Sequence, residues 1–153
     1  MNNETEIVVW DKTIATGIEY IDNQHKELVS LTNELYRACR IGGDNTVGPA
    51  FKDTMIRMVE YVRFHFSAEL VLLKRIKYPK YDEHKTEHDS LVKQILAAVN
   101  EYQTGKKYAP YSFVRTLKDW VFGHIAIRDK LYAAYVADQL KKGALSPKDI
   151  EGQ

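Results

Sequence analysis

The sequence predicts an all-α protein: an antiparallel up-down-up-down four-helix bundle with an N-terminal arm. Apolar residues recur every three or four positions in four long segments, which is the spacing of one face of a helix. The prolines and glycine clusters of the 153-residue chain fall between these segments, where helices begin and end. The connections are short, which favours antiparallel packing of consecutive helices. We therefore expect an arm over residues 1–18, a bundle over 19–142 and a polar tail over 143–153.

The first helix is expected from about Glu19 to Arg40, and its inward face includes His25. Gly42 and Gly43 are expected to end it, because glycine adopts the left-handed conformation of a C-terminal cap. In the arm before this helix, Trp10 is the expected anchor onto the bundle. The apolar residues expected on the inward face are Ile18, Ile21, Leu28, Leu31 and Leu35.

The second helix is expected from about Pro49 to Lys77 and the third from about Asp82 to Gln103. Proline suits the first turn of a helix, and Pro79 disfavours helix at the residue before it. Gly105 is expected to stop the third helix. The inward residues are expected to be Met55, Val59, Val62, Phe66, Leu73 and Ile76 in the second helix, and Leu91, Ile95 and Val99 in the third.

The fourth helix is expected from about Ser112 to Lys142, with Leu117, Val121, Leu131 and Tyr135 facing inward. The residues that follow, 143–153, are mostly polar. Chain ends that bury little apolar surface are usually poorly ordered. We therefore expect a loose tail.

The composition excludes several classes of protein. The 22 basic and 21 acidic side chains leave a formal charge of +1, whereas a nucleic-acid-binding protein normally has a clear basic excess. The longest apolar run, Leu131 to Ala137, is far shorter than the roughly 18 residues of a membrane span, and no signal peptide is visible. The single cysteine, Cys39, is consistent with a reducing compartment, so a cytoplasmic location is expected.

All five histidines lie inside the predicted helices or at their first turns, on the same faces as apolar residues. A lone inward histidine is most simply a core residue that is hydrogen-bonded to a neighbour. Five of them from four helices, with none left for the surface, require a common purpose, and a metal ion provides one. These residues are His25, His65, His84, His88 and His124.

The spacing of the histidines and acids adds detail. His65 and Glu69 are four residues apart, as are His84 and His88, so each pair lies on one helix face and could hold one metal ion or flank two. Asp129 follows His124 by five residues, which in an α-helix turns it away by about 140°. Spacing alone therefore disfavours Asp129 as a partner of His124, unless a π-bulge brings it inward.

Short motifs at these positions resemble those of the bacterial hemerythrins, from Trp10 to about Tyr135. Each motif is weak by itself, but five histidines and two acids in this order make the set specific. The motifs are Trp10, Gly17-Ile18 and the run from Ile21 to Leu28; His65 to Glu69; Tyr78 to Tyr81 with His84 and His88; and Trp120 to Ile125 followed by Asp129-Lys130.

The resemblance implies a non-haem di-iron centre, with an oxygen atom from solvent between two iron ions, that binds O₂ reversibly. One ion would take His84, His88 and His124, and the other would take His25 and His65. Glu69 and Asp129 would bridge the two ions, which leaves one open position where O₂ would bind. By the same motifs Leu28, Phe66, Trp120 and Val121 would form an apolar pocket there, although ordinary core packing explains any one of them nearly as well.

The leading interpretation is O₂ storage, delivery or sensing, without enzyme activity in the usual sense. A ligand set with only two negative charges is less suited to highly oxidised iron than one with four acids, which favours reversible binding over oxidation of a substrate. A second class is a di-iron oxidase, peroxidase or NO-handling protein on the same scaffold. A third, a purely structural or partner-binding bundle, leaves the histidines unexplained.

The resemblance also bears on ligands and partners. Azide or other small anions are further candidate ligands, and an O₂-accepting protein is an open candidate partner. Sensing often requires a fused signalling domain, for which 153 residues leave no room, so a free-standing carrier is favoured.

Overall fold

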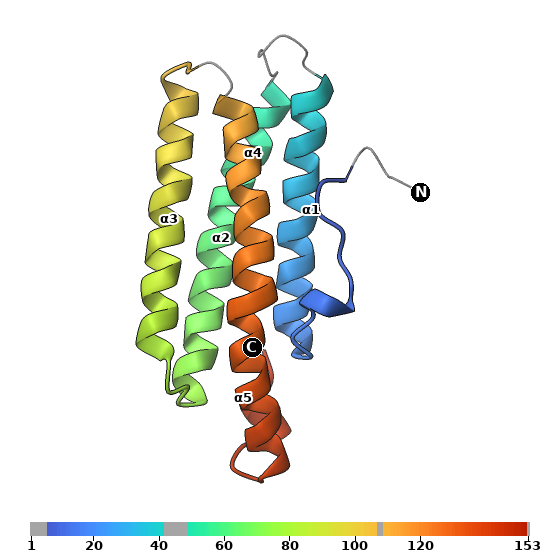
Figure 1. Ribbon diagram of the computed structural model, residues 1–153, viewed down its shortest axis with the longest axis vertical. Coiled ribbons are helices and arrows are strands. Elements are labelled where there is room, and N and C mark those ends of the chain that lie inside the picture. Colours follow the sequence, from blue (N-terminus) through green and yellow to red (C-terminus); the bar gives the residue numbers. More distant parts are fainter. Residues whose placement is uncertain (1–5, 42–48, 107–108, 153) are drawn as a thin grey trace.

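The computed structural model describes residues 6–41, 49–106 and 109–152, and these residues form helices and no strand. The helices are α1 (Glu19–Ile41), α2 (Pro49–Arg75), α3 (Tyr81–Gln103), α4 (Ala109–Trp120) and α5 (Lys130–Lys141). A π-helical segment, η2 (Val121–Asp129), joins α4 to α5, so that the three make one long fourth helix (Figure 1). The predicted all-α four-helix bundle is confirmed.

The four long helices run antiparallel, each reversing the direction of the one before it (Figure 1). α1 packs beside α2 and α4, and α3 packs beside α2 and α4. α5 extends beyond the ends of the other helices. In the part of the chain that the structure describes, every helix is too short or too polar to cross a membrane.

Val8 and Asn33 provide one of the attachments that hold the N-terminal arm on the bundle. Val8 is buried, and the side-chain oxygen of Asn33 accepts hydrogen bonds from the backbone N–H groups of Ile7 and Val8 at 2.8 and 3.0 Å. The amide of Asn33 donates back to the carbonyl of Val8 at 2.8 Å. Trp10, the expected anchor, is only half-buried, with the Lys26 ammonium 5.5 Å from the centre of its ring.

Left-handed residues follow three of the described helices, among them Gly143 (φ 74°) after α5. Lys77 (φ 55°) follows the last turn of α2, and Gly105 (φ 75°) lies just after α3, as the sequence predicts for Gly105. The expected stop at Gly42 and Gly43 lies outside the described residues.

The inward face of α5 differs from the prediction by one residue. Leu131 is 45 % exposed, whereas Tyr132 is fully buried. Likewise Val136 is buried and Tyr135 is only half-buried. The reason is η2: a π-helical turn holds one residue more than an α-helical turn, so every later inward position moves one residue along the chain. The inward assignment of Leu131 is therefore wrong.

The C-terminal residues pack against the bundle, contrary to the expected loose tail. A short helix, η3 (Pro147–Ile150), follows α5, and Leu145 and Ile150 pack against buried apolar residues at that end of the bundle. The Arg75 guanidinium donates hydrogen bonds to the backbone carbonyls of Asp149 (3.2 Å) and Glu151 (3.0 Å). Carbonyl acceptors belong to every residue type, so polarity in the sequence could not reveal this docking.

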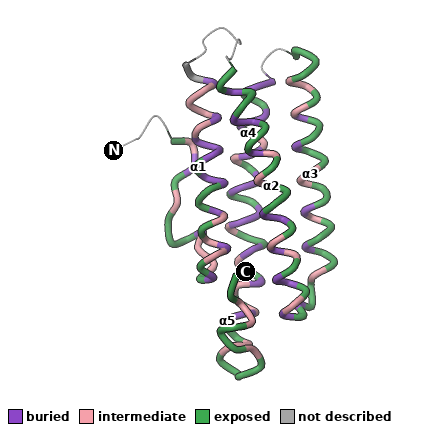
Figure 2. Tube along the Cα trace, turned by 180° about the vertical axis from the view of Figure 1, so that it is seen from behind, coloured by how far each residue is buried: buried purple, intermediate pink, exposed green. Residues whose placement is uncertain are grey.

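Among the described residues the apolar core falls into two clusters. Buried residues recur along the length of α1 and α2 (Figure 2). The larger cluster includes Leu28 and Val62, and the smaller one, toward the α5 end, includes Ile21 and Leu72. His25 lies between Ile21 and Leu28 along α1, and the pair His65 and Glu69 lies between Val62 and Leu72 along α2. A buried polar layer thus separates the two apolar clusters.

Candidate metal centre

The polar layer contains all seven residues that the sequence singles out. They come from each of the four long helices, and none is more than 5 % exposed. The donor atoms form two groups, each within 4.8 Å, which share Glu69 and Asp129. One group adds His84, His88 and His124, and the other adds His25 and His65.

The π-helical segment is what turns Asp129 inward. His124 and Asp129 both lie within η2 and both are buried. In a π-helix the hydrogen bonds join residues five apart, so residues with this spacing lie one above the other. The five-residue spacing disfavoured Asp129 unless a local π-helix turned it inward, and that π-helix is present.

Each carboxylate directs one oxygen toward each group of histidines. Glu69 Oε1 lies 2.7 Å from His84 Nε2 and 3.0 Å from His88 Nε2, while Glu69 Oε2 lies 3.1 Å from His65 Nε2. Asp129 divides its oxygens in the same way: Oδ1 lies 3.2 Å from His84 Nε2, and Oδ2 lies 3.0 Å from His25 Nε2. His124 Nε2 is 3.0 Å from the same Asp129 Oδ1.

The hydrogen bonding inside the layer is poor for a protein core. Among the described residues neither oxygen of Asp129 finds a partner with hydrogen-bond geometry, although both are buried. Two pairs of imidazole nitrogens face each other, His25 Nε2 and His65 Nε2 at 3.2 Å and His88 Nε2 and His124 Nε2 at 3.1 Å. Buried polar atoms are normally paired, so lone pairs converging in this way favour cations between them. The donor set therefore fits two metal ions, and imidazole with carboxylate suits iron.

The charges of the layer shift its pKa values strongly. Burial lowers the pKa of His25 and His84, but the carboxylates of Asp129 and Glu69 outweigh burial and raise both to about 9. The same balance raises the pKa of His124, whereas burial lowers that of His88. Burial raises the pKa of the two acids, but the surrounding histidines outweigh it and hold both carboxylates ionised. In the absence of metal ions, protonated histidines thus balance the charge of the two carboxylates.

Comparison with known proteins agrees with this geometry. Residues 16–136 match the family described as Hemerythrin HHE cation binding domain. The chain belongs to the hemerythrin family.

Individual hemerythrins are similar to this chain over most of its length. A bacteriohemerythrin of Stenotrophomonas maltophilia is 29 % identical over 139 residues, covering 90 % of this chain and 87 % of the relative. One from Methylococcus capsulatus is 27 % identical over 117 residues, covering 76 % of this chain and 86 % of the relative. A crystal structure of a hemerythrin mutant superposes with a TM-score of 0.74 at 25 % identity, covering 84 % of this chain and 96 % of the other.

Residues outside the polar layer, which the sequence alone did not identify, form hydrogen bonds to its members. The Tyr132 hydroxyl, fully buried, donates a hydrogen bond to Glu69 Oε2 at 3.1 Å. His65 Nδ1 lies 2.7 Å from the side-chain oxygen of Gln24, and His124 Nδ1 lies 3.0 Å from Glu87 Oε1. Gln24 and Glu87 each directly precede a histidine of the layer, but that position alone predicts no contact. The sequence contains ten tyrosines, and no pattern in it singles out Tyr132.

The four apolar residues assigned to a hemerythrin pocket are all buried. The ring of Phe66 stacks on His88 at 3.8 Å between centroids and meets the ring of Trp120 edge-on at 5.6 Å. Trp120 in turn stacks on His124 at 5.9 Å. Leu28 and Val121 belong to the same apolar cluster. This side of the layer is therefore covered by apolar side chains, apart from the buried indole N–H of Trp120.

Proposed function

We propose that this hemerythrin-family protein binds O₂ reversibly at two iron ions held by the buried layer. The observation that carries the proposal is the division of Glu69 and Asp129, each with one oxygen toward each histidine group. Carboxylates so placed can join two cations. Iron held there would supply the redox chemistry by which O₂ is taken up and released.

In this proposal His84, His88 and His124 bind one ion and His25 and His65 bind the other, with Glu69 and Asp129 shared. Five neutral imidazoles and two carboxylates provide seven donors, two of them used twice. The ion with two histidines then has one donor fewer than the other. That difference supports O₂ binding at the two-histidine ion.

The apolar residues of the proposed pocket exclude water and anions from the ions. Leu28, Phe66, Trp120 and Val121 offer no charged or strongly hydrogen-bonding atom other than the indole N–H. A dry surrounding slows the entry of water and of small anions such as azide. Their entry would promote loss of the reduced oxygen as peroxide and would leave ferric iron, which no longer binds O₂. Storage or delivery of O₂ is the proposed use, in the cytoplasm, and an O₂-accepting protein is a candidate partner.

The decisive experiment is an iron count combined with visible spectra of the full chain. We expect two irons per chain, a charge-transfer band that changes on addition of azide, and bleaching when O₂ is removed, with recovery when it returns. An iron-free protein, or one iron per chain, would contradict the site. Sustained turnover of O₂, peroxide or NO would contradict the carrier function and would indicate an enzyme of the same family instead.

A further inference from the structure

The two histidine groups differ in what holds the outer nitrogen of their rings. In the two-histidine group, His65 Nδ1 faces the neutral amide oxygen of Gln24 at 2.7 Å. In the three-histidine group, His124 Nδ1 faces the carboxylate of Glu87 at 3.0 Å. The Nδ1 atoms of His25 and His88 are buried without a partner among the described residues. An anionic acceptor thus supports one group and a neutral one supports the other.

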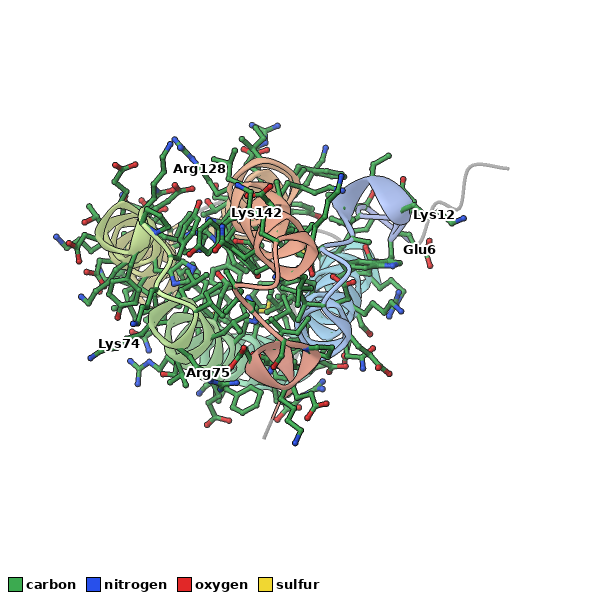
Figure 3. The ribbon with its side chains drawn as sticks, turned by 90° about the horizontal axis from the view of Figure 1, so that it is seen from below. Glu6, Lys12, Lys74, Arg75, Arg128 and Lys142 are labelled. Carbon is green, nitrogen blue, oxygen red and sulfur yellow. The ribbon has the colours of Figure 1, made fainter. Side chains whose placement is uncertain are left out.

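Glu87 is itself held in place from a second helix. Its other oxygen, Oε2, lies 2.9 Å from Arg128 Nε, so the carboxylate is fixed at both ends. Glu87 comes from α3, whereas Arg128 and His124 come from η2. Figure 3 shows Arg128 at the outside of the bundle, on the side of the fourth helix toward α3. The three residues form a continuous series of side-chain contacts from the surface to the buried layer.

The outer end of this series of three residues faces solvent. A surface cavity of about 440 Å³ is lined by Glu87, His124 and Arg128 among others. The Glu87 side chain is 29 % exposed, while that of His124 is 1 % exposed. Water could therefore reach the outer nitrogen of His124 if the Glu87 side chain were shortened, and it would be a weaker and less fixed acceptor.

We propose that Glu87, held by Arg128, is a positioning residue that fixes the His124 ring with Nδ1 protonated and Nε2 facing the carboxylates. The negative charge of Glu87 then makes His124 the strongest nitrogen donor of the layer. A ring whose Nδ1–H donates to a carboxylate gains basicity at Nε2, and such outer partners commonly contribute about 10–100-fold to metal affinity. The inference rests on the proposed function, because it concerns the same ions. It adds that the three-histidine ion is held more tightly than the other for an electrostatic reason.

The test compares variants of the full chain that separate charge from hydrogen bonding. Glu87→Gln keeps an acceptor oxygen and removes the charge, and Glu87→Ala removes both. Asp89→Asn is the matched control, since it removes a carboxylate from the same helix that is 61 % exposed and paired only with Lys85 among the described residues. Metal affinity is measured with Zn²⁺, and separately with Fe²⁺ under anaerobic conditions, in competition with a chelator. NMR of the zinc-loaded chain reports whether the Nδ1–H proton of His124 is retained.

We expect Glu87→Gln to weaken the tighter of the two sites about tenfold or more while retaining the Nδ1–H signal of His124. Glu87→Ala should weaken that site and also lose the slowly exchanging signal, and Asp89→Asn should match wild type. Circular dichroism of each metal-free variant shows whether it is folded. If Glu87→Gln binds as tightly as Asp89→Asn, the inference is wrong although the metal site stands. If wild type binds neither metal, the proposed function itself fails.

Discussion

At the scale of single residues, Tyr132 is a buried tyrosine whose hydroxyl donates a hydrogen bond to a carboxylate of the polar layer. Its ring is fully buried between apolar neighbours, and its hydroxyl reaches Glu69 Oε2. Burial and the charges of Glu69 and Asp129 raise its pKa well above the ordinary value, so the hydroxyl stays protonated and acts as a donor. A hydrogen bond to a charged group stabilises more than one between neutral groups, about 1.5–3 against about 1 kcal/mol.

Replacing Tyr132 by phenylalanine should therefore destabilise the metal-free protein by about 1.5–3 kcal/mol, because a buried carboxylate loses a donor. Tyr135→Phe is the matched control, since the Tyr135 hydroxyl donates to the neutral carbonyl of Ile76 at 3.1 Å. That variant should lose about 1 kcal/mol or less. Urea unfolding of both variants measures the difference, and equal losses would show that the charge of Glu69 is irrelevant to the bond.

Val121 provides a second prediction at this scale. It is fully buried in the apolar cluster, at the first position of η2, and belongs to the proposed pocket. Leucine is larger by one methylene, so Val121→Leu should narrow the pocket and slow the entry of azide and O₂. Stopped-flow azide binding and the autoxidation rate of the iron-loaded protein measure this. Unchanged rates in both assays would place Val121 in ordinary core packing.

At the scale of elements, the π-helical segment changes what the fourth helix presents. The sequence alone predicts one continuous α-helical stripe through Leu117, Val121, Leu131 and Tyr135. Leu117 and Val121 precede the extra residue of η2 and are buried as predicted. Beyond it, Tyr132 takes the inward place expected for Leu131, and Asp129 turns toward the histidines. One local irregularity thus supplies both a proposed bridging carboxylate and the tyrosine that donates to the other.

The C-terminal segment is the second element that the sequence did not predict correctly. Arg75 lies beside it at the end of the bundle (Figure 3). The backbone also passes close to Tyr20, because a Cβ added at Gly152 would lie 2.7 Å from Tyr20 Cγ. The segment closes the end of the smaller apolar cluster.

Arg75→Met should destabilise the protein by about 1 kcal/mol, since two hydrogen bonds to Asp149 and Glu151 are lost. The neighbouring Lys74→Met should change stability by no more than about 0.5 kcal/mol, because Lys74 is exposed. Urea unfolding gives the free energies, and limited proteolysis should cut residues 143–153 faster in the Arg75 variant. Equal behaviour of the two variants would mean that the segment docks through Leu145 and Ile150 alone.

At the scale of the whole molecule, folding and metal binding share one buried layer. Without metal, the layer is stabilised by protons on its histidines and by ionised carboxylates. A raised histidine pKa contributes stability that is complete below the ordinary value of 6.5 and is lost as pH rises through the folded value of about 9. A lowered acid pKa contributes stability that is lost as pH falls below about 4.

The metal-free protein should therefore be most stable between about pH 4.5 and 6.5, and its melting temperature should fall between pH 6.5 and 9. His88, with its lowered pKa, acts in the opposite direction but is outnumbered by His25, His84 and His124. Metal requires neutral imidazole, so the increase in melting temperature on adding Zn²⁺ should grow over the same range. Thermal unfolding at several pH values, with and without Zn²⁺, checks both trends. An increment that shrinks as pH rises would contradict a histidine site.

The sequence by itself determined the four helices, their antiparallel order and the inward positions of the five histidines, because helical periodicity depends on residues that are near one another in the chain. His65 with Glu69 and His84 with His88 were readable for the same reason. The tertiary structure alone decided which oxygen of each carboxylate faces which histidines, that Gln24 and Glu87 support the rings, and that Arg75 docks the C-terminal segment. Those contacts join different helices, and η2 shifts the register of the last helix by one residue. Such features depend on packing across the bundle, for which a single sequence has no periodicity to read.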